Sequence, residues 1–218
     1  MTLKDYIDNV MLGVNVEFAA LELDEGTVAM FVNQARKQVF TAICEQYPAV
    51  FTVYLNGIAG SSSVVFAIAD RFVRETAVVV DPGGGNPLVP ARRLSKAEWQ
   101  MVQTNSFVSP SDTSPVYYLS NLTITLLPAA KDVRCYYVKG TTDLAVLGDA
   151  EDVLVVEAQE LVIRRAQAYC YEKLAMTDAK DAVQAEYDMQ LKQLMDDWGD
   201  AENNIRTALS SRTPMQTP

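Results

Sequence analysis

The side chains best suited to chemistry are adjacent carboxylates, which occur at Glu151-Asp152 and at Asp196-Asp197. Such pairs can bind a divalent cation or act as general acid and base. Both pairs, however, fall near the ends of predicted helices. Negative charge in a first helical turn complements the helix dipole, which explains Glu151 and Asp152 without catalysis. The same rule disfavours Asp196 and Asp197 near a helix C-terminus, so we expect them to be solvated or matched to a partner.

Histidine is absent from the sequence, which removes the imidazole base of Ser-His-Asp and Cys-His mechanisms and every His-ligated zinc site. The serine run 61–63 lacks a G-x-S-x-G context, so we interpret it as a turn. Cys44, Cys135 and Cys170 are widely spaced and form no C-x-x-C pair, which is typical of buried cysteines in a reducing compartment. We predict no catalytic residue, no cofactor and no metal site.

The glycine-rich loop Gly83-Gly84-Gly85 lies between Asp81 and Pro87. A phosphate-binding loop would continue into Gly-Lys-Ser or Gly-Lys-Thr, and a dinucleotide fingerprint would open a helix, but neither pattern follows Gly85. We interpret the segment as a flexible connection between strands. The alternative is a loop that becomes ordered against a neighbouring subunit.

Charge limits the classes of partner. Of the 218 residues, 18 are Lys or Arg and 28 are Asp or Glu, which gives a formal net charge of −10. An acidic chain is poorly suited to general nucleic-acid binding. Residues 1–10 lack the pattern of a secretory signal, and charged side chains interrupt the richest apolar stretch, 64–80. We therefore expect a soluble chain with no export signal and no membrane partner.

Helical spacing characterises the N-terminal part of the sequence. From 21 to 47, apolar residues recur at steps of three and four, and Pro48 should end this helix. A short amphipathic stretch, 3–11, predicts another helix before it.

Helical spacing returns toward the C-terminus. The segments 154–173 and 178–198 predict two long helices that pack antiparallel, the second ending at Gly199. Glu160 and Arg164 form a favoured i,i+4 pair in the first of them.

The middle of the chain is typical of short strands, because β-branched and aromatic runs alternate with turn residues. The predicted strands are 51–55, 64–69, 76–80, 116–119, 122–127 and 133–138. Ser120-Asn121 separates the fourth strand from the fifth, and Asn tolerates the positive φ of a tight turn, so we predict a β-hairpin. Ser95 and Glu98 form a capping box that opens a short helix between strands.

Together these elements predict an α+β fold. N-terminal helices occupy 1–47, and about six mostly antiparallel short strands with one short helix occupy 50–147. An antiparallel helical hairpin occupies 151–199, and an extended tail follows at 201–218. We expect 1–200 to form a single domain.

Candidate partner contacts come from tyrosines and from the tail. Tyr117-Tyr118 and Tyr136-Tyr137 place rings on both faces of strands that we expect to be adjacent, so one ring of each pair should face the core and the other solvent or an interface. We take Tyr117 and Tyr136 as contacts. Base stacking is the alternative, but it needs basic neighbours. In the tail, we expect three apolar side chains to anchor on a partner, namely Ile205, Leu209 and Met215.

The order of elements resembles that of the head-to-tail adaptor, or head completion, proteins of tailed bacteriophages. Four segments carry the resemblance: the early helix with Phe31-Val32-Asn33-Gln34-Ala35-Arg36 that ends at Tyr-Pro, the tyrosine-rich hairpin 115–128, the following strand 133–138, and the closing helix pair 154–173 and 178–198.

The resemblance implies a non-enzymatic virion protein, made in the host cytoplasm and located in the neck of the particle. It would form a ring of about twelve copies below the portal, joining capsid to tail. Its partners would be further copies of itself, the portal protein, and tail or further neck proteins. DNA would pass through the lumen without specific binding, because an acidic lumen repels phosphates.

Two other classes of function remain open from the residues alone. One is a monomeric protein-binding module that uses the strand face around Tyr117 and Tyr136. The other is a metal-dependent enzyme with Asp81 or the acidic pairs as ligands.

Overall fold

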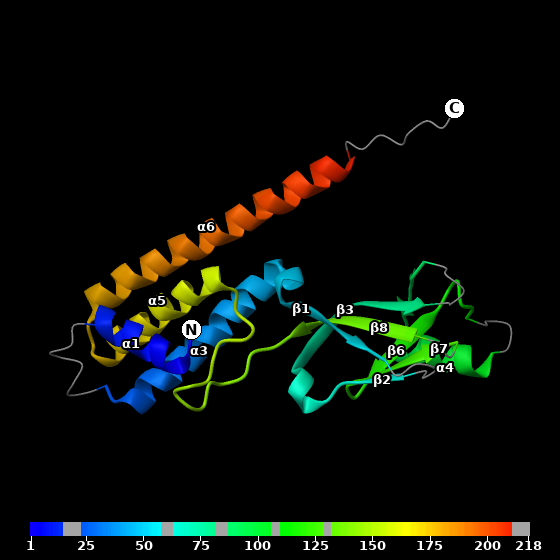
Figure 1. Ribbon diagram of the computed structural model, residues 1–218, viewed down its shortest axis with the longest axis horizontal. Coiled ribbons are helices and arrows are strands. Elements are labelled where there is room, and N and C mark those ends of the chain that lie inside the picture. Colours follow the sequence, from blue (N-terminus) through cyan, green and yellow to red (C-terminus); the bar gives the residue numbers. More distant parts are fainter. Residues whose placement is uncertain (15–22, 58–62, 82–86, 106–109, 129–131, 211–218) are drawn as a thin grey trace. The chain divides into compact units, whose positions relative to one another are not determined.

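The computed structural model (Figure 1) describes residues 1–14, 23–57, 63–81, 87–105, 110–128 and 132–210, with only the backbone for 201–210. The chain divides into two compact units: the helical unit, 1–45 with 143–218, and the strand unit, 46–142. The predicted α+β class is confirmed, with helices at both ends of the chain and short strands between them. A single domain over 1–200 stays a prediction, which separate unfolding of the two units would test.

The N-terminal helices of the helical unit are α1 (Leu3–Gly13) and α3 (Glu25–Gln46), close to the predicted bounds. Thr2 begins α1, because its hydroxyl accepts a hydrogen bond from the amide of Asp5 while the Asp5 carboxylate accepts one from the amide of Thr2. α3 ends just before Pro48, whose ring and missing N–H cannot continue a helix.

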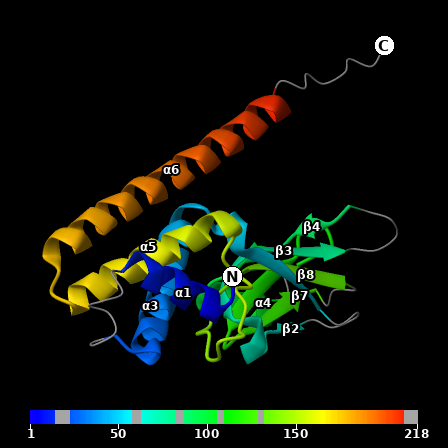
Figure 2. The ribbon, with the colours of Figure 1, turned by 60° about the vertical axis from the view of Figure 1, so that its left-hand side comes forward.

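The apolar stripe of α3 supplies much of the core of the helical unit. Its residues at steps of three and four are fully buried, namely Val28, Val32, Ala35, Val39 and Ile43. α1 lies against α5 (Val156–Lys173), as Figure 2 also shows. The predicted amphipathic faces are therefore the faces that pack.

The closing helices α5 and α6 (Thr177–Ser210) form the predicted antiparallel hairpin. Arg165 of α5 joins three helices, since it donates hydrogen bonds to Gln38 of α3 and to Gln184 of α6. Its guanidinium also lies over the rings of Tyr169 and Tyr187.

The ion pair between Glu160 and Arg164 is present, with Oε1 and Nη2 3.9 Å apart, and Arg164 also reaches Glu186 of α6 at 3.6 Å. The predicted i,i+4 pair is therefore confirmed, and it also contributes to the contact between the two helices.

The end of α6 differs from the sequence prediction. The helix does not stop at Gly199 but continues through Ser210, so the first part of the predicted extended tail, 201–210, is helical. A single glycine costs a helix only about 1 kcal/mol relative to alanine, and the next proline comes only at Pro214. Residues 211–218 lie outside the described part of the chain.

The strand unit contains two sheets with the strand orders β1-β8-β3-β4 and β2-β7-β6-β5. Their bounds are β1 Thr52–Asn56, β2 Ser63–Val65, β3 Phe72–Asp81, β4 Val89–Pro90, β5 Arg92–Arg93, β6 Val116–Ser120, β7 Thr123–Leu127 and β8 Asp132–Lys139. The described strand pairs are antiparallel apart from β5 and β6, which pair in parallel.

The two sheets share one apolar core. It combines Val78, Val80, Val133, Cys135 and Tyr137 of the first sheet with Val64, Tyr117, Ile124 and Leu126 of the second, together with Phe66. Leu126 and Ile124 are fully buried, while the threonines between and beside them are partly exposed, which confirms the predicted alternation in this strand. Helix α4 (Lys96–Thr104) covers the other face of the second sheet through Trp99, which stacks on Tyr118.

Three details of the strand unit differ from the prediction. The strand expected over 64–69 ends at Val65, and a 3-10 turn, η2 (Ile68–Asp70), follows it. Another 3-10 turn, η1 (Pro48–Phe51), occupies the start of the first predicted strand. The two-residue strands β4 and β5 are too short to leave a periodic signal in the sequence.

The predicted β-hairpin is present, but its turn lies one residue further along the chain. Ser120 pairs with Thr123, so Asn121 and Leu122 are the two turn residues, with φ of 49° and 60°. Positive φ at both positions is the mark of a type I′ turn. Asparagine accommodates this conformation well, whereas leucine does so at a cost.

Candidate functional site

The outer face of the sheet β1-β8-β3-β4 carries the candidate site. Because side chains alternate along a strand, Val133 and Cys135 of β8 point into the core while Arg134 and Tyr136 point outward. Across the sheet, Tyr54 pairs with Tyr136, and Asn56 of the same strand pairs with Arg134.

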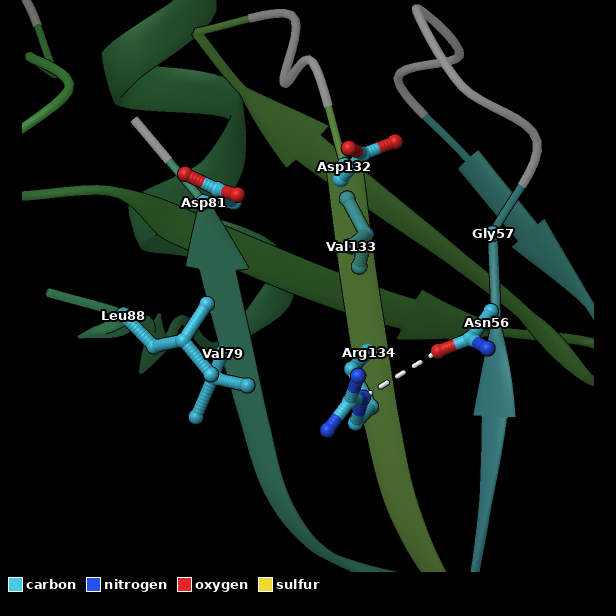
Figure 3. Close-up of a pocket in the computed structure, with 8 residues that line it drawn as sticks. All are labelled: Asn56, Gly57, Val79, Asp81, Leu88, Asp132, Val133 and Arg134. Atoms are coloured by element: carbon cyan, nitrogen blue, oxygen red, sulfur yellow. Dashed lines mark hydrogen bonds between the residues drawn. The ribbon is translucent and has the colours of Figure 1, made fainter. Parts of the chain in front are cut away.

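Arg134 is held in place by its neighbours on this face. Its Nε donates to Oδ1 of Asn56 at 3.2 Å (Figure 3), and its Nη1 lies 3.5 Å from the hydroxyl of Tyr136. Its guanidinium carbon lies 4.9 Å from the centre of the Tyr54 ring. We call Tyr54, Asn56, Arg134 and Tyr136 the Arg134 cluster. Both hydrogen-bond acceptors are neutral, so they orient the guanidinium without neutralising its charge.

A pocket of about 310 Å³ extends from this cluster. Its lining residues are Asn56, Gly57, Val79, Asp81, Leu88, Asp132, Val133 and Arg134. Asp81 ends β3 and faces Asp132, which begins β8. Figure 3 shows these two carboxylates at one end of the pocket, with Arg134 and Asn56 further along the strands. The pocket therefore has an acidic end and a guanidinium end.

The Arg134 cluster and the pocket beside it contain side chains that are typical of protein interfaces. Among the described residues, no group of three or more Cys, Asp or Glu side chains is placed to hold a metal ion. Two carboxylates alone make a weak site for a divalent cation, which takes six or more oxygen ligands. Tyrosine and arginine, by contrast, are the side chains that dominate protein interfaces.

The candidate tyrosines separate in the structure. Tyr136 is partly exposed in the Arg134 cluster, whereas Tyr117 lies in the core with 5% of its surface exposed. Burial, with Glu75 nearby, raises the pKa of Tyr117 to about 12. The expectation that the two tyrosine pairs lie on adjacent strands is wrong, because β6 and β8 belong to different sheets. The role of Tyr117 and Tyr136 as partner contacts stays a prediction.

The other candidate contacts are only partly described. Ile205 and Leu209 lie within the helical backbone of α6, where side chains are not described, and Met215 lies outside the described residues. The loop Gly83-Gly84-Gly85 also lies outside them.

Arg134, Asn56 and Tyr54 were not predicted as site residues from the sequence. One available signal was the single charged residue Arg134 inside the otherwise uncharged run 133–138, since in an alternating strand such a residue marks the outer face. The pairing of Arg134 with Asn56 joins residues far apart in the sequence, and no local pattern predicts it.

The carboxylate pair Glu151-Asp152 occupies an unexpected place. It does not lie in the first turn of a helix, because α5 begins at Val156. Instead, the segment that carries it is fixed to the N-terminus, where Leu3 and Glu151 donate backbone hydrogen bonds to the carbonyls of Asp149 and Met1. These bonds draw Glu151 into the helical unit.

Glu151 forms a buried two-point ion pair with Arg36 of α3. Nε and Nη2 of Arg36 lie 2.6 and 3.0 Å from the two carboxylate oxygens, and the two side chains are 1% and 0% exposed. One of these oxygens also accepts hydrogen bonds from the amides of Asp152, Val153 and Leu154. The carboxylate therefore has its charge and its hydrogen-bonding capacity satisfied inside the unit.

The protonation of this site follows from its surroundings. Burial by itself would raise the pKa of Glu151, but Arg36 and the backbone amides of Leu154 and Val153 together hold that pKa below its ordinary value. Burial, with the negative charge of Glu151 nearby, raises the pKa of Tyr6. The Glu151 carboxylate is therefore ionised near neutral pH and acts as a fixed structural charge.

Asp196 and Asp197 are exposed and lie well inside α6, because the helix continues to Ser210. Their predicted position near a helix C-terminus is therefore wrong. Asp197 also borders a shallow groove of about 240 Å³ between α5 and α6, which is lined by Glu157, Glu160, Leu161, Gln190, Gln193, Leu194 and Asp197.

The three cysteines are free and buried, as the sequence predicts. Burial raises the pKa of Cys170 to about 12, and burial together with Glu75 raises the pKa of Cys135 to about 12. These two thiols therefore stay protonated near neutral pH and are poor nucleophiles.

Within the described part of the chain, no helix has the length and apolar character that crossing a bilayer requires. Comparison with known proteins gives no match, either to a protein-family model or to a curated protein.

Proposed function

We propose that the chain is a structural virion protein, a head-to-tail adaptor that forms a ring below the portal. In this role it joins capsid to tail and leaves a channel through which DNA passes without specific binding. Its partners are further copies of itself, the portal protein, and tail or further neck proteins. The resemblance in the order of elements motivates the proposal.

The observation that carries the proposal is the division of charge between the two units. Over the whole sequence, the helical unit has 10 Lys and Arg against 22 Asp and Glu, a formal charge of −12. The strand unit has 8 against 6, a formal charge of +2. A closed ring is built from head-to-tail contacts, in which one face of a subunit fits a different face of the next. Two units of opposite charge favour such a contact and disfavour like-with-like pairing.

The test is electron microscopy of the protein mixed with portal-containing particles from its own source. We expect additional rotationally symmetric density at one vertex of the particle. Particles that remain unchanged at saturating protein concentration would remove the adaptor role.

A monomeric protein-binding module is the second candidate, and the exposed Arg134 cluster favours it. The two candidates differ in mass, because the chain alone is 24.0 kDa and a ring is many times larger. Mass measurement in the presence of the particles' portal protein separates them, since some adaptors assemble only on their partner.

A further inference from the structure

We propose that the Arg134 cluster binds the acidic segment 196–200 of α6 in a second copy of this chain. The inference rests on the proposed ring, and it names the two faces that meet between neighbouring subunits. One face belongs to the strand unit and the other to the helical unit.

The two sheets of the strand unit differ in what covers their outer faces. Trp99 of α4 stacks on Tyr118 and covers the second sheet. On the first sheet, Tyr54 is 57% exposed although its ring lies close to both Arg134 and Tyr136. A large, oriented, amphipathic side chain of this kind loses little conformational entropy on binding and is a common anchor of protein interfaces.

The guanidinium of Arg134 is oriented so that it can bind a carboxylate. Its two hydrogen-bond acceptors, Asn56 and Tyr136, fix its position but carry no negative charge. A guanidinium has more N–H donors than these two contacts use, and its planar fork matches the geometry of a carboxylate. A negatively charged side chain from outside would therefore complete the site.

The helical unit offers such carboxylates. Asp196, Asp197 and Asp200 are all exposed, and residues three or four apart lie on the same side of a helix. α6 has 34 residues and α5 has 18, which correspond to about 51 Å and 27 Å. Both Figure 1 and Figure 2 show α6 extending past the end of α5. Asp197 still borders the groove between the two helices, so the acidic segment lies where α6 leaves its hairpin partner.

The two ends of the pocket fix how the helix would lie. Asp81 and Asp132 at the acidic end repel the carboxylates of α6, whereas Arg134 attracts them. The acidic segment should therefore lie over Tyr54 and Arg134, away from the paired carboxylates. The charges of the two units, −12 and +2, favour the same pairing over longer distances.

The test uses a photo-crosslinker in place of the exposed tyrosine, Tyr54→p-benzoylphenylalanine. This chain is mixed with an equal amount of 15N-labelled unmodified chain, both free at high concentration and bound to portal-containing particles. After irradiation and trypsin digestion, we expect a cross-link to the labelled peptide 193–206, which contains the acidic segment. Because the captured peptide carries the label, it comes from a second copy.

A matched control places the same crosslinker at Met101, which is also exposed but lies on α4 over the other sheet. We expect no capture of peptide 193–206 from that position. Capture of a different protein by the Tyr54 probe, or no capture of peptide 193–206 in either sample, overturns the inference.

Charge reversal tests the same contact without a photo-crosslinker. Arg134→Glu should lower the yield of a disulfide between Tyr54→Cys in one chain and Asp200→Cys in another at least tenfold. Mixing the Arg134→Glu chain with a chain that carries Asp196→Lys and Asp197→Lys should restore the yield. No loss on Arg134→Glu, or a loss without recovery in the swapped pair, contradicts the contact.

The outcomes separate this inference from the proposed function. Ring density on particles without capture of peptide 193–206 leaves the adaptor role standing and removes the contact. Capture in free solution without density on particles supports the contact and removes the adaptor role.

Discussion

The helical unit and the strand unit of this chain have net charges of opposite sign. The helical unit has a formal charge of −12, whereas the strand unit is weakly basic, with a formal charge of +2. The overall value of −10 therefore describes neither part. An argument from net charge, such as repulsion of DNA phosphates from a lumen, applies to a surface only if the helical unit forms that surface.

The two units also differ in what their interiors contain. The helical unit encloses the ion pair between Arg36 and Glu151, which joins α3 to the segment before α5. The core of the strand unit is an apolar and aromatic cluster between two sheets, and its ion pair of Glu75 with Arg93 leaves the arginine more than half exposed. Both interiors are mainly apolar, but only the helical unit encloses an ion pair whose two side chains are both fully buried among the described residues.

The largest expected effect comes from breaking the buried pair with Arg36→Met. The substitution leaves the Glu151 carboxylate buried without a cation, so the free energy of unfolding of the helical unit should fall by about 3–5 kcal/mol. Urea unfolding followed by the fluorescence of Trp198, which lies in this unit, measures it in a Trp99→Phe background.

Lys37 provides the control, because it follows Arg36 on α3 but its ion pair with Asp143 is more than half exposed. Lys37→Met should change the free energy of unfolding by less than about 1 kcal/mol. In the double variant Arg36→Met/Glu151→Gln, part of the lost stability should return. Equal effects of Arg36→Met and Lys37→Met would show that the buried pair contributes no more to the free energy of unfolding than the exposed pair does.

The strand unit should respond to loss of packing instead. Leu126 is fully buried between the sheets, so Leu126→Ala should lower the free energy of unfolding of that unit by about 2–5 kcal/mol. Trp99 reports on this unit, in a Trp198→Phe background. Thr125→Ala, one residue away on the opposite face of β7, should cost about 1 kcal/mol or less.

Comparing the two tryptophan signals tests whether the units are independent. We expect Leu126→Ala to shift the Trp99 transition and to leave the Trp198 transition in place. If both transitions move together, the units unfold as one domain, as predicted from the sequence for 1–200. The two units would then differ in composition but not in their stability.

Acidification should act on the helical unit through Glu151, with an effect smaller than that of Arg36→Met. Because the folded-state pKa lies below the ordinary value of 4.5, the ionised carboxylate stabilises the fold fully above that value. As the pH falls below about 4.5 and through the folded-state pKa, this stabilisation is lost. The Trp198 transition should therefore weaken as the pH falls below about 4.5.

Glu151→Gln isolates this contribution, since it removes the titrating group and keeps an oxygen for the backbone amides. Its free energy of unfolding should depend less on pH than that of the unmodified chain. Asp149→Asn is the control, because backbone amides of Val146 and Ala145 lower the pKa of this exposed carboxyl. If Asp149→Asn flattens the pH profile as much as Glu151→Gln does, the buried pair is not the source.

Local patterns in the sequence predict most of the elements and few of the site residues. Periodicity locates α3, α5 and the hairpin of β6 and β7, because the apolar residues of one face recur at regular steps within a short stretch of sequence. The capping box of Ser95 with Glu98 is present as predicted, with both hydrogen bonds formed.

The sites escape prediction because they join distant segments. Glu151 meets Arg36 only because the N-terminus pairs with the segment around Asp149, and Arg134 meets Asn56 only through the register of β1 with β8. Burial of a glutamate cannot be inferred from its neighbours in sequence when its partner lies more than a hundred residues away.

The smallest expected effect concerns a turn in the strand unit. There, the backbone conformation of one residue, and not a buried charge, should change the free energy of unfolding. Leu122 has a φ of 60° in the turn between β6 and β7, a conformation that costs an L-residue about 1–2 kcal/mol. Leu122→Gly removes this cost and creates the Asn-Gly pair favoured in type I′ turns. After the greater chain entropy of glycine is subtracted, the strand unit should gain about 0.5–1 kcal/mol.

Leu122→Ala separates backbone conformation from loss of the side chain, because it removes most of the same exposed side chain but keeps a Cβ at positive φ. We expect the Trp99 transition to move to higher urea concentration for Leu122→Gly and not for Leu122→Ala. The Trp198 transition should stay in place in both variants, since a turn within the strand unit contributes nothing to the ion pair of Arg36 with Glu151. A gain of equal size for alanine would assign the effect to the exposed leucine side chain instead of the backbone.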